Sequence, residues 1–330
     1  MSLLSIPHRV KTIVLIYGIA VYIGAWQLLN MFASLFKRNH INYITKSAEC
    51  RRKVAVVTGG SSGIGLSTVR RLNKQNFYVI SIARDHQQTN KLKDVKKYDV
   101  DLSDFEALQL VIEEVRNSYE TIDVLVNCAG IMFHHHQAND HGVEHHLAVN
   151  YLSHFILTML LLPLMKNSSY ATIVNVTSST YAVNSLSFSE NIFKVDAKNF
   201  CRYEWYAASK HAMLLFTMKL RKILQSEGCN HVKVVAYDPG TVKTNLFQYS
   251  DFLTNLIITW FGKIFLQPPT AAANEISEIV ASADAKVLYC SWKQRYVDLA
   301  DQARLSSKFQ DELYNTSCKF LQSSLIYSLY

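Results

Sequence analysis

The stretch Val54-Ala-Val-Val-Thr-Gly-Gly-Ser-Ser-Gly-Ile-Gly65 decides the fold of this chain. Its first four residues form a short apolar run, which is typical of a strand buried on both faces of a parallel sheet. A glycine-rich turn follows, and a helical pattern then continues to Leu72. Strand, glycine turn and helix in this order begin a βαβ unit, so the sequence predicts an α/β fold.

The same turn predicts a binding site for a dinucleotide. Gly59 permits a tight turn, Gly63 lets the backbone approach a pyrophosphate, and Gly65 lets the helix pack on the strand. The pyrophosphate then lies at the positive end of the helix. The turn residues that we expect to bind the cofactor are Thr58, Gly59, Ser61, Ser62, Gly63, Ile64 and Gly65.

The end of the second strand indicates which dinucleotide binds. The apolar run from Phe77 to Ala83 is followed directly by Arg84. At this position a carboxylate binds the ribose 2′-hydroxyl of NAD, whereas an arginine accommodates the 2′-phosphate of NADP. We therefore expect NADP(H) to be preferred. NAD(H) stays open as a second cofactor, and an ordinary solvated charge is the alternative interpretation of Arg84.

Strands and helices alternate along the rest of the chain. A further strand is expected at 97–100, apolar strand patterns occur at 122–126, 172–176 and 232–236, and we expect the last of these to be the final strand. The alternation predicts a Rossmann-type, doubly wound parallel sheet with helices on both faces. Ligands bind beyond the carboxyl ends of such strands, so the hydroxyl groups at 177–179 are expected in the site.

A helix-forming run from Tyr206 to Leu224 contains the candidate acid–base pair. Tyr206 and Lys210 are four residues apart, which places them one turn apart on one face of a helix. An ammonium group beside a phenol stabilises the phenolate, so Tyr206 can serve as a general acid or base. The pair alone also arises by chance on solvated helices, and its meaning depends on the rest of the chain.

The N-terminal region predicts a membrane anchor. No charged residue occurs from Thr12 to Phe36, and about 20 apolar residues are enough for a helix to cross a bilayer. We expect an uncleaved transmembrane helix within residues 1–38, a linker at 39–50 and a catalytic domain at 51–330. The heavier basic flank, at 37–38 and 51–53, favours a cytosolic catalytic domain.

The amino-acid composition limits the kinds of partner that the protein can bind. The net charge of +8 is not accompanied by interleaved basic and aromatic residues, so a membrane surface is favoured over nucleic acid. The six cysteines include no C-x-x-C pair, which argues against structural zinc and against a disulfide scaffold. His141-Gly-Val-Glu-His145 matches the H-x-x-E-H zinc pattern, but we interpret it as a helix start with surface imidazoles and expect no metal.

The ordered set of motifs resembles the short-chain dehydrogenase/reductase superfamily. The matching motifs are T-G-x-x-x-G-x-G from Thr58, D-L at Asp101, N-x-A-G at Asn127, Asn150, Ser178 after a strand, Y-x-x-x-K from Tyr206, and P-G-x-V-x-T from Pro239. Together they cover about residues 51 to 290. The segment from His141 to Thr158, with the anchor and the long C-terminal extension, is similar to the membrane-anchored retinol dehydrogenase and polyprenol dehydrogenase branch. Cys128 departs from the pattern, because it replaces an asparagine.

The resemblance implies catalytic roles. Tyr206 would exchange a proton with the substrate oxygen, which Ser178 would hydrogen-bond, with Ser179 as the alternative. Lys210 would lower the pKa of Tyr206 and hold the nicotinamide ribose, and Asn150 would bind a water that links Lys210 to solvent. The further residues implied in cofactor binding are Asp101, Leu102, Asn127, Ala129, Gly130, Pro239, Gly240, Val242 and Thr244.

We therefore expect an NAD(P)-dependent enzyme that interconverts a lipophilic alcohol and its aldehyde or ketone. Polyprenol/dolichal-type molecules, retinoids and steroids are all open as substrates, and a non-catalytic cofactor-binding scaffold on a membrane is the competing hypothesis. An aromatic-rich segment at 245–266 is expected to close over the site as a lid. We further expect attachment to the endoplasmic reticulum, and a homodimer stays open.

Overall fold

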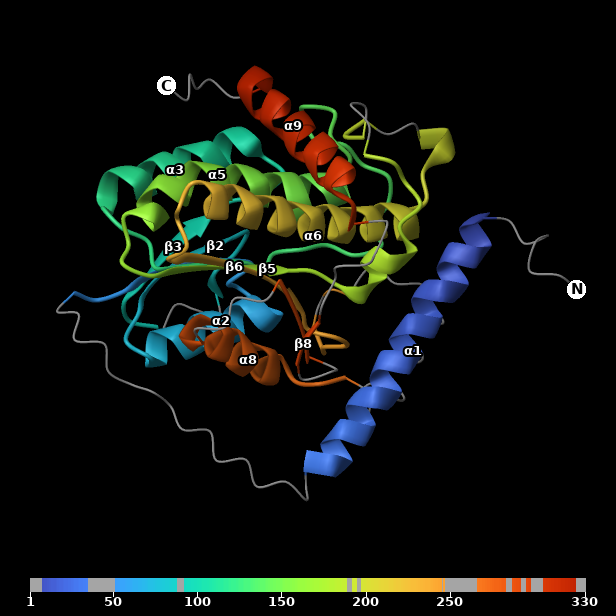
Figure 1. The fold of residues 1–330 in the computed structure, drawn as a ribbon, viewed down its shortest axis with the longest axis horizontal. Coiled ribbons are helices and arrows are strands. Elements are labelled where there is room, and N and C mark those ends of the chain that lie inside the picture. Colours follow the sequence, from blue (N-terminus) through green and yellow to red (C-terminus); the bar gives the residue numbers. More distant parts are fainter. Residues whose placement is uncertain are drawn as a thin grey trace, which may run out of the picture.

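An eight-stranded sheet forms the centre of the structure, in the order β3-β2-β1-β4-β5-β6-β7-β8 (Figure 1). The computed structural model describes residues 8–34, 51–87, 92–188, 192–194, 197–244, 246, 266–282, 287–291, 295–297 and 305–324. The strands are β1 Val54–Thr58, β2 Tyr78–Ala83, β3 Val95–Asp99, β4 Val124–Asn127, β5 Ala171–Val176, β6 Val232–Asp238, β7 Leu288–Cys290 and β8 Arg295–Val297. The predicted Rossmann-type sheet is confirmed, because the seven strands from β3 to β7 pair in parallel and the order reverses between β1 and β4.

The prediction that 232–236 forms the final strand is wrong. β6 continues to Asp238, and β7 and β8 then extend the sheet, with β8 antiparallel to β7. These last two strands have three residues each, which is too short for a periodic pattern to reveal them. Strand β3 also begins earlier than expected, at Val95, and its exposed Lys96 and Asp99 fit its place at the edge of the sheet.

Helices cover both faces of the sheet, as the sequence predicts (Figure 1). The helical segments are α1 His8–Ser34, α2 Gly63–Lys74, α3 Phe105–Ser118, α4 His145–Leu147, η3 Ala148–Leu152, α5 Ser153–Lys166, η4 Ser179–Val183, η5 Ala197–Asn199, α6 Arg202–Ser226, α8 Pro269–Ala281 and α9 Ser307–Ser324. Helices α3, α5 and α6 lie on one face, with α9 packed outside α6, and α2 and α8 lie on the other face.

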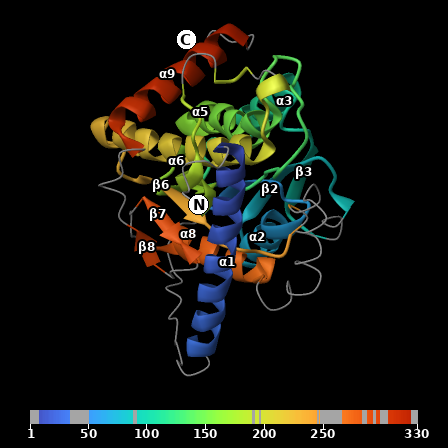
Figure 2. The ribbon, with the colours of Figure 1, turned by 90° about the vertical axis from the view of Figure 1, so that its right-hand side faces the viewer.

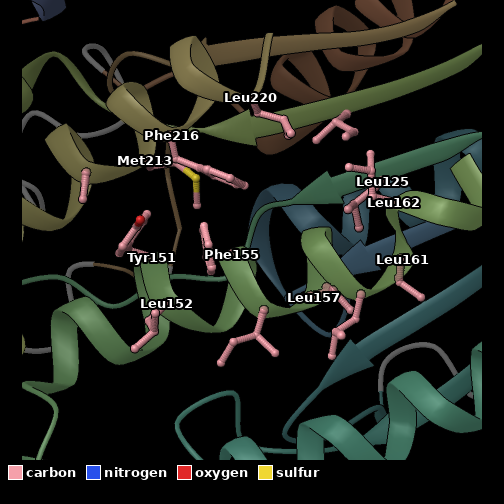
Figure 3. Close-up of a cluster of buried hydrophobic side chains, with 14 of the residues drawn as sticks. Leu125, Tyr151, Leu152, Phe155, Leu157, Leu161, Leu162, Met213, Phe216 and Leu220 are labelled. Carbon is pink, nitrogen blue, oxygen red and sulfur yellow. The ribbon is translucent and has the colours of Figure 1, made fainter. Parts of the chain in front are cut away.

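The larger core lies between the sheet and helices α5 and α6 (Figure 3). Tyr151 and Phe155 point from η3 and α5 toward Phe216 of α6, and the rings of Phe155 and Phe216 have their centroids 5.0 Å apart. Burying such side chains contributes about 1.5–3 kcal/mol each. This packing fixes the position of α6 and therefore of the candidate residues on it.

Helix α1 lies across the edge of the sheet where the central strands have their carboxyl ends (Figure 2). It contacts α6 and η4, so the predicted anchor packs against the catalytic domain along part of its length. Among the described residues, two segments are long and apolar enough to cross a membrane, Arg9–Leu29 and His145–Lys166. The second is a core segment, since 89% of it is buried.

Two predicted segments cannot be compared with the structure. The linker at 39–50 lies outside the described residues, and of the predicted lid at 245–266 the structure describes only positions 246 and 266. Both therefore stay predictions.

Candidate active site

A cavity of about 680 Å³ opens at the carboxyl ends of the central strands, where the strand order reverses. This is the place at which open α/β sheets bind their ligands. The predicted cofactor residues that line it are Gly59, Ser61, Ser62, Gly63, Ile64, Gly65, Arg84, Asp101, Leu102, Ala129, Gly130, Pro239, Gly240, Val242 and Thr244. Of the predicted catalytic residues, Ser178, Tyr206 and Lys210 also line it.

The glycine turn has the geometry that a pyrophosphate requires. Gly59 has a φ of 69°, a left-handed conformation that side chains rarely allow. A Cβ atom on Gly65 would lie 2.2 Å from the carbonyl oxygen of Gly59, so only glycine fits between turn and helix. Helix α2 begins at Gly63, and its first turn carries no carboxylate. The free amides at its start therefore fit the negative charge of a dinucleotide.

Thr58 and Asn127 were predicted to bind the cofactor, but their side chains do not line this cavity. The hydroxyl of Thr58 instead accepts hydrogen bonds from the amides of Cys128 and Ala129, at 2.9 and 3.0 Å. The buried Asn127 donates its amide to Asn175 at 2.8 Å. Both side chains hold strand ends together, so they shape the cofactor site from behind.

Tyr206 lies in the cavity beside Ser178. Its side chain extends from α6 and the residue is only 4% exposed, whereas Ser178 follows β5. Burial raises the pKa of Tyr206 well above its usual value, a hydrogen bond with Ser178 opposes the increase, and the charge of Asp238 adds to it. The phenol is therefore protonated at neutral pH and can donate a proton.

Lys210 occupies the next turn of α6. Its ammonium donates to the carbonyl oxygen of Val176 at 3.1 Å and lies 6.0 Å from the centroid of the Tyr206 ring. Burial lowers the pKa of Lys210 to about 8, and Cys128 and Asp238 oppose the change. For Tyr206 the largest influence on the pKa is burial, which raises it; the lowering of this pKa by Lys210 stays a prediction.

Asn150 lies behind this pair, in the π-helical segment η3, a local geometry that is frequent at functional sites. It accepts from the amide of Ile131 at 2.8 Å and donates to the carbonyl of Ile131 and the hydroxyl of Ser209, both at 2.9 Å. Its side chain is fully buried and does not line the cavity. The contacts tie α6 to the loop after β4, which is a positioning role.

Asp238 is a charged residue of the cavity that the sequence reasoning did not count among the site residues. It ends β6 and lines the cavity, and its carboxylate accepts hydrogen bonds from the hydroxyl of Ser179 and the amide of Gly240. Ser179 is thereby turned away from the cavity, which favours Ser178 over Ser179 as the residue beside Tyr206. The position of Asp238 directly before Pro239 is the sequence feature that could have indicated its place in the site.

The remaining wall of the cavity is mostly apolar and comes from segments far apart in the sequence. Met132 and Phe133 follow β4, and Ile16, Tyr17 and Ile23 belong to α1. Phe133 has a φ of 54°, uncommon for an aromatic residue, and its ring meets that of Tyr206 edge-on at 5.5 Å. Such backbone strain clusters at functional sites. The sequence reasoning did not predict that α1 forms part of this wall.

The histidine-rich segment makes separate contacts. His141 pairs with Glu106 at 2.8 Å, and the fully buried His146 pairs with Glu144 at 2.7 Å. His145 alone of these histidines lines the cavity, and burial lowers its pKa to about 4. Within the part of the chain that the structure describes, no three or more potential metal ligands come together.

Comparisons with known proteins agree with this geometry. The family model described as short chain dehydrogenase matches residues 53–190. Mouse retinol dehydrogenase 12 is 30% identical over 291 residues, covering 84% of this chain and 89% of the relative. Human polyprenol dehydrogenase is 28% identical over 286 residues, covering 81% of this chain and 84% of the relative.

Solved structures share the fold. A protein from Mycobacterium paratuberculosis superposes with a TM-score of 0.64 at 22% identity, covering 82% of this chain and 93% of that one. A 3-ketoacyl-(acyl-carrier-protein) reductase from Brucella melitensis, crystallised with NADH, superposes with a TM-score of 0.55 at 22% identity, covering 74% and 98%.

The chain belongs to the short-chain dehydrogenase family. Within that family it falls in the retinol dehydrogenase-like branch, and it is an NAD(P)-dependent oxidoreductase of alcohols and carbonyl compounds.

Proposed function

We propose that this protein uses NADP(H) to interconvert a lipophilic alcohol of the polyprenol or retinoid type and its aldehyde or ketone. The observation that carries the proposal is the convergence of Ser178, Tyr206 and Lys210 on a cavity whose remaining wall is mostly apolar. The relatives named for polyprenol and retinol support an isoprenoid alcohol as the substrate. Polyprenol/dolichal-type molecules come first, because of the resemblance in the anchor and the C-terminal extension.

The chain's own residues move the proton. In the direction of reduction, the protonated Tyr206 gives its proton to the substrate oxygen while Ser178 holds that oxygen by a hydrogen bond. The bound nicotinamide supplies the hydride. Lys210 is positioned one helical turn away, where its positive charge would attract the cofactor and contact the nicotinamide ribose. The apolar wall excludes water from the reacting carbon.

Cofactor binding is proposed from residues at the strand ends. The amides at the start of α2 would hold the pyrophosphate, and Asp101, Leu102, Ala129 and Gly130 would lie beside the adenosine half. The loop of Pro239, Gly240, Val242 and Thr244 would run past the nicotinamide carboxamide.

Arg84 supports the preference for NADP(H). It lines the cavity and is exposed, so its guanidinium can meet a 2′-phosphate. The next residue, Asp85, does not line the cavity and accepts a hydrogen bond from the amide of Gln87 at 3.0 Å. The carboxylate of Asp85 is therefore not directed at the 2′-phosphate. In this proposal NAD(H) binds more weakly than NADP(H).

The proposed location is a membrane, with α1 as the anchor. Residues 1–38 would attach the protein to the endoplasmic reticulum, residues 39–50 would link the anchor, and residues 51–330 would work in the cytosol, alone or as a homodimer. The apolar side chains exposed on α1, which include Val14, Leu15 and Leu29, support contact with lipid. The segment 245–266 would close over the substrate.

The experiment is a substrate panel on the full-length protein in detergent. Polyprenal, retinal and a ketosteroid are each offered with NADPH and with NADH, and cofactor oxidation is followed. We expect the isoprenoid aldehydes with NADPH to give the largest kcat/KM. Turnover of the steroid alone, or binding of NADPH without turnover of any carbonyl compound, would overturn the proposal.

A further inference from the structure

We propose that α1 is part of the active site as well as an anchor: its inner face forms the wall that binds the apolar chain of the substrate, and Gln27 fastens this wall to the cofactor loop. The inference rests on the proposed function in assuming a lipophilic substrate, but the position of α1 can be tested without turnover.

Helix α1 has two different faces. Thr12, Ile16 and Ile23 are buried against the catalytic domain, with exposures of 2%, 4% and 4%. Their spacing of four and seven residues places them on one side of a helix. On the other side Val14 and Leu29 are 61% and 63% exposed. A helix that is apolar all round is expected to be covered everywhere, so the catalytic domain covers one side and lipid suits the other.

The inner face reaches the proton donor. Ile16 packs in one cluster with Met132, Phe133, Tyr203 and Tyr206. The rings of Tyr17 and Tyr203 have centroids 6.3 Å apart, and their hydroxyl oxygens are separated by 3.5 Å. An apolar group held against this face would therefore lie near Tyr206, the proposed proton donor.

Gln27 attaches α1 to the loop that follows β6. Its side-chain oxygen accepts from the amide of Thr241 at 3.3 Å and also from the hydroxyl of Thr241. A Cβ atom on Gly240 would lie 2.6 Å from the side-chain nitrogen of Gln27, so the two segments are in close contact. A buried polar atom is costly unless it is paired. The oxygen of Gln27 is paired with Thr241 and holds α1 against the proposed nicotinamide loop, whereas the side-chain nitrogen is buried with no hydrogen-bond partner among the described residues.

The arrangement defines the occupant of the space between α1 and residues 131–133 as the isoprenoid chain of the substrate. Ile19, Ala20 and Ile23 of α1 line the cavity, as Ile16 and Tyr17 do. The chain would enter from the bilayer along α1, since the outer side of the same helix is exposed and apolar. Charged or short substrates would gain no binding free energy from such an apolar wall.

The first test fills part of the cavity beside α1 with a larger side chain. Ala20→Trp places a ring in the cavity, whereas Val14→Trp places the same ring on the outer face and serves as the matched control. With a long and a short isoprenoid aldehyde of the same head group, Ala20→Trp should lower kcat/KM for the long one roughly tenfold more than for the short one. Equal effects of the two variants on kcat/KM, or equal losses of kcat/KM for both aldehydes, would refute the proposal that α1 forms the wall that binds the substrate chain.

The second test does not depend on turnover. Ile16→Cys and Val14→Cys are made in the full chain in detergent, and labelling by an apolar maleimide is followed by mass spectrometry. We expect Ile16→Cys to be labelled at least tenfold more slowly, and Gln27→Ala to remove much of that protection. Equal labelling at both positions would refute the docking of α1. Protection without activity on any lipophilic carbonyl compound would refute the proposed function and leave the docked helix in place.

Discussion

The two halves of the cavity are built in different ways. The proposed cofactor half consists of backbone turns and strand ends, as at Gly59 and Gly65, where only one residue type fits. The substrate half consists of apolar side chains from α1 and from the loop after β4, such as Ile16 and Met132. A dinucleotide demands fixed donors and close backbone approach, whereas an apolar chain demands only shape and the absence of water. The residue types in the cofactor half are therefore narrowly restricted, whereas many apolar residues could form the substrate half.

The largest expected effect is at the junction of the two halves. Tyr206→Phe removes the proton donor, and general acid–base catalysis contributes about 10²–10⁴ in rate. We expect kcat to fall by roughly that factor while the Kd for NADPH, measured by fluorescence titration, changes only a few fold because the ring still packs. Tyr119→Phe makes the same chemical change outside the cavity and should leave kcat unchanged. More than roughly a tenth of the original kcat in Tyr206→Phe would remove Tyr206 from its role.

Arg84→Ala tests the cofactor half alone. A charge-assisted hydrogen bond to the 2′-phosphate contributes about 1.5–3 kcal/mol, so the KM for NADPH should rise roughly tenfold or more. The KM for NADH should hardly change, because NADH has no phosphate at that position. Arg116→Ala, at another exposed arginine, is the control. Equal effects of Arg84→Ala on both cofactors would show that Arg84 is an ordinary surface charge.

The pH dependence should report Lys210. Burial lowers the pKa of Lys210 to about 8, so its positive charge is present below that pH and is lost above it. Because the charge would attract the cofactor, kcat/KM for NADPH should fall by about tenfold per pH unit above the Lys210 pKa. In Lys210→Arg the fall should move to higher pH, since a guanidinium stays protonated. A profile that is the same in both proteins would assign the titration to another group.

The smallest expected effect is at the contact between the halves. Gln27→Ala removes a hydrogen bond whose net contribution is about 0.5–1.5 kcal/mol, so we expect the KM for NADPH to rise roughly threefold to tenfold. Gln27→Asn keeps the amide but shortens the side chain, and it should have an intermediate effect. An unchanged KM for NADPH in both variants would show that the contact of α1 with the cofactor loop does not affect cofactor binding, so the two halves of the cavity would act independently.

Removing residues 1–38 sharpens the same comparison. The truncated protein should lose far more activity on an aldehyde embedded in vesicles than on a short, soluble one, because both the anchor and the wall are absent. Equal activity on the two substrates, measured as kcat/KM, would contradict delivery of the substrate from the membrane.

The predicted site residues that the structure brings to one cavity share a physical origin. The glycine turn, Tyr206 and Lys210 were found because their chemistry needs particular residues at fixed local spacing. The side-chain hydrogen bonds of Thr58 and Asn127 were not predicted, because their partners, such as Cys128 and Asn175, are distant in sequence. The same holds for the pKa of Tyr206, which burial in the assembled core raises and the hydrogen bond with Ser178 opposes.

The sequence by itself determined the Rossmann-type sheet, the family and the position of the proposed proton donor, because strand periodicity, glycine geometry and helical spacing are local properties. Only the tertiary structure decided where α1 lies, that Asp238 engages Ser179, and that β7 and β8 complete the sheet. Each of these depends on contacts between segments far apart in the chain. An apolar helix carries no local mark of what covers it, since burial against protein and burial in lipid favour the same residues.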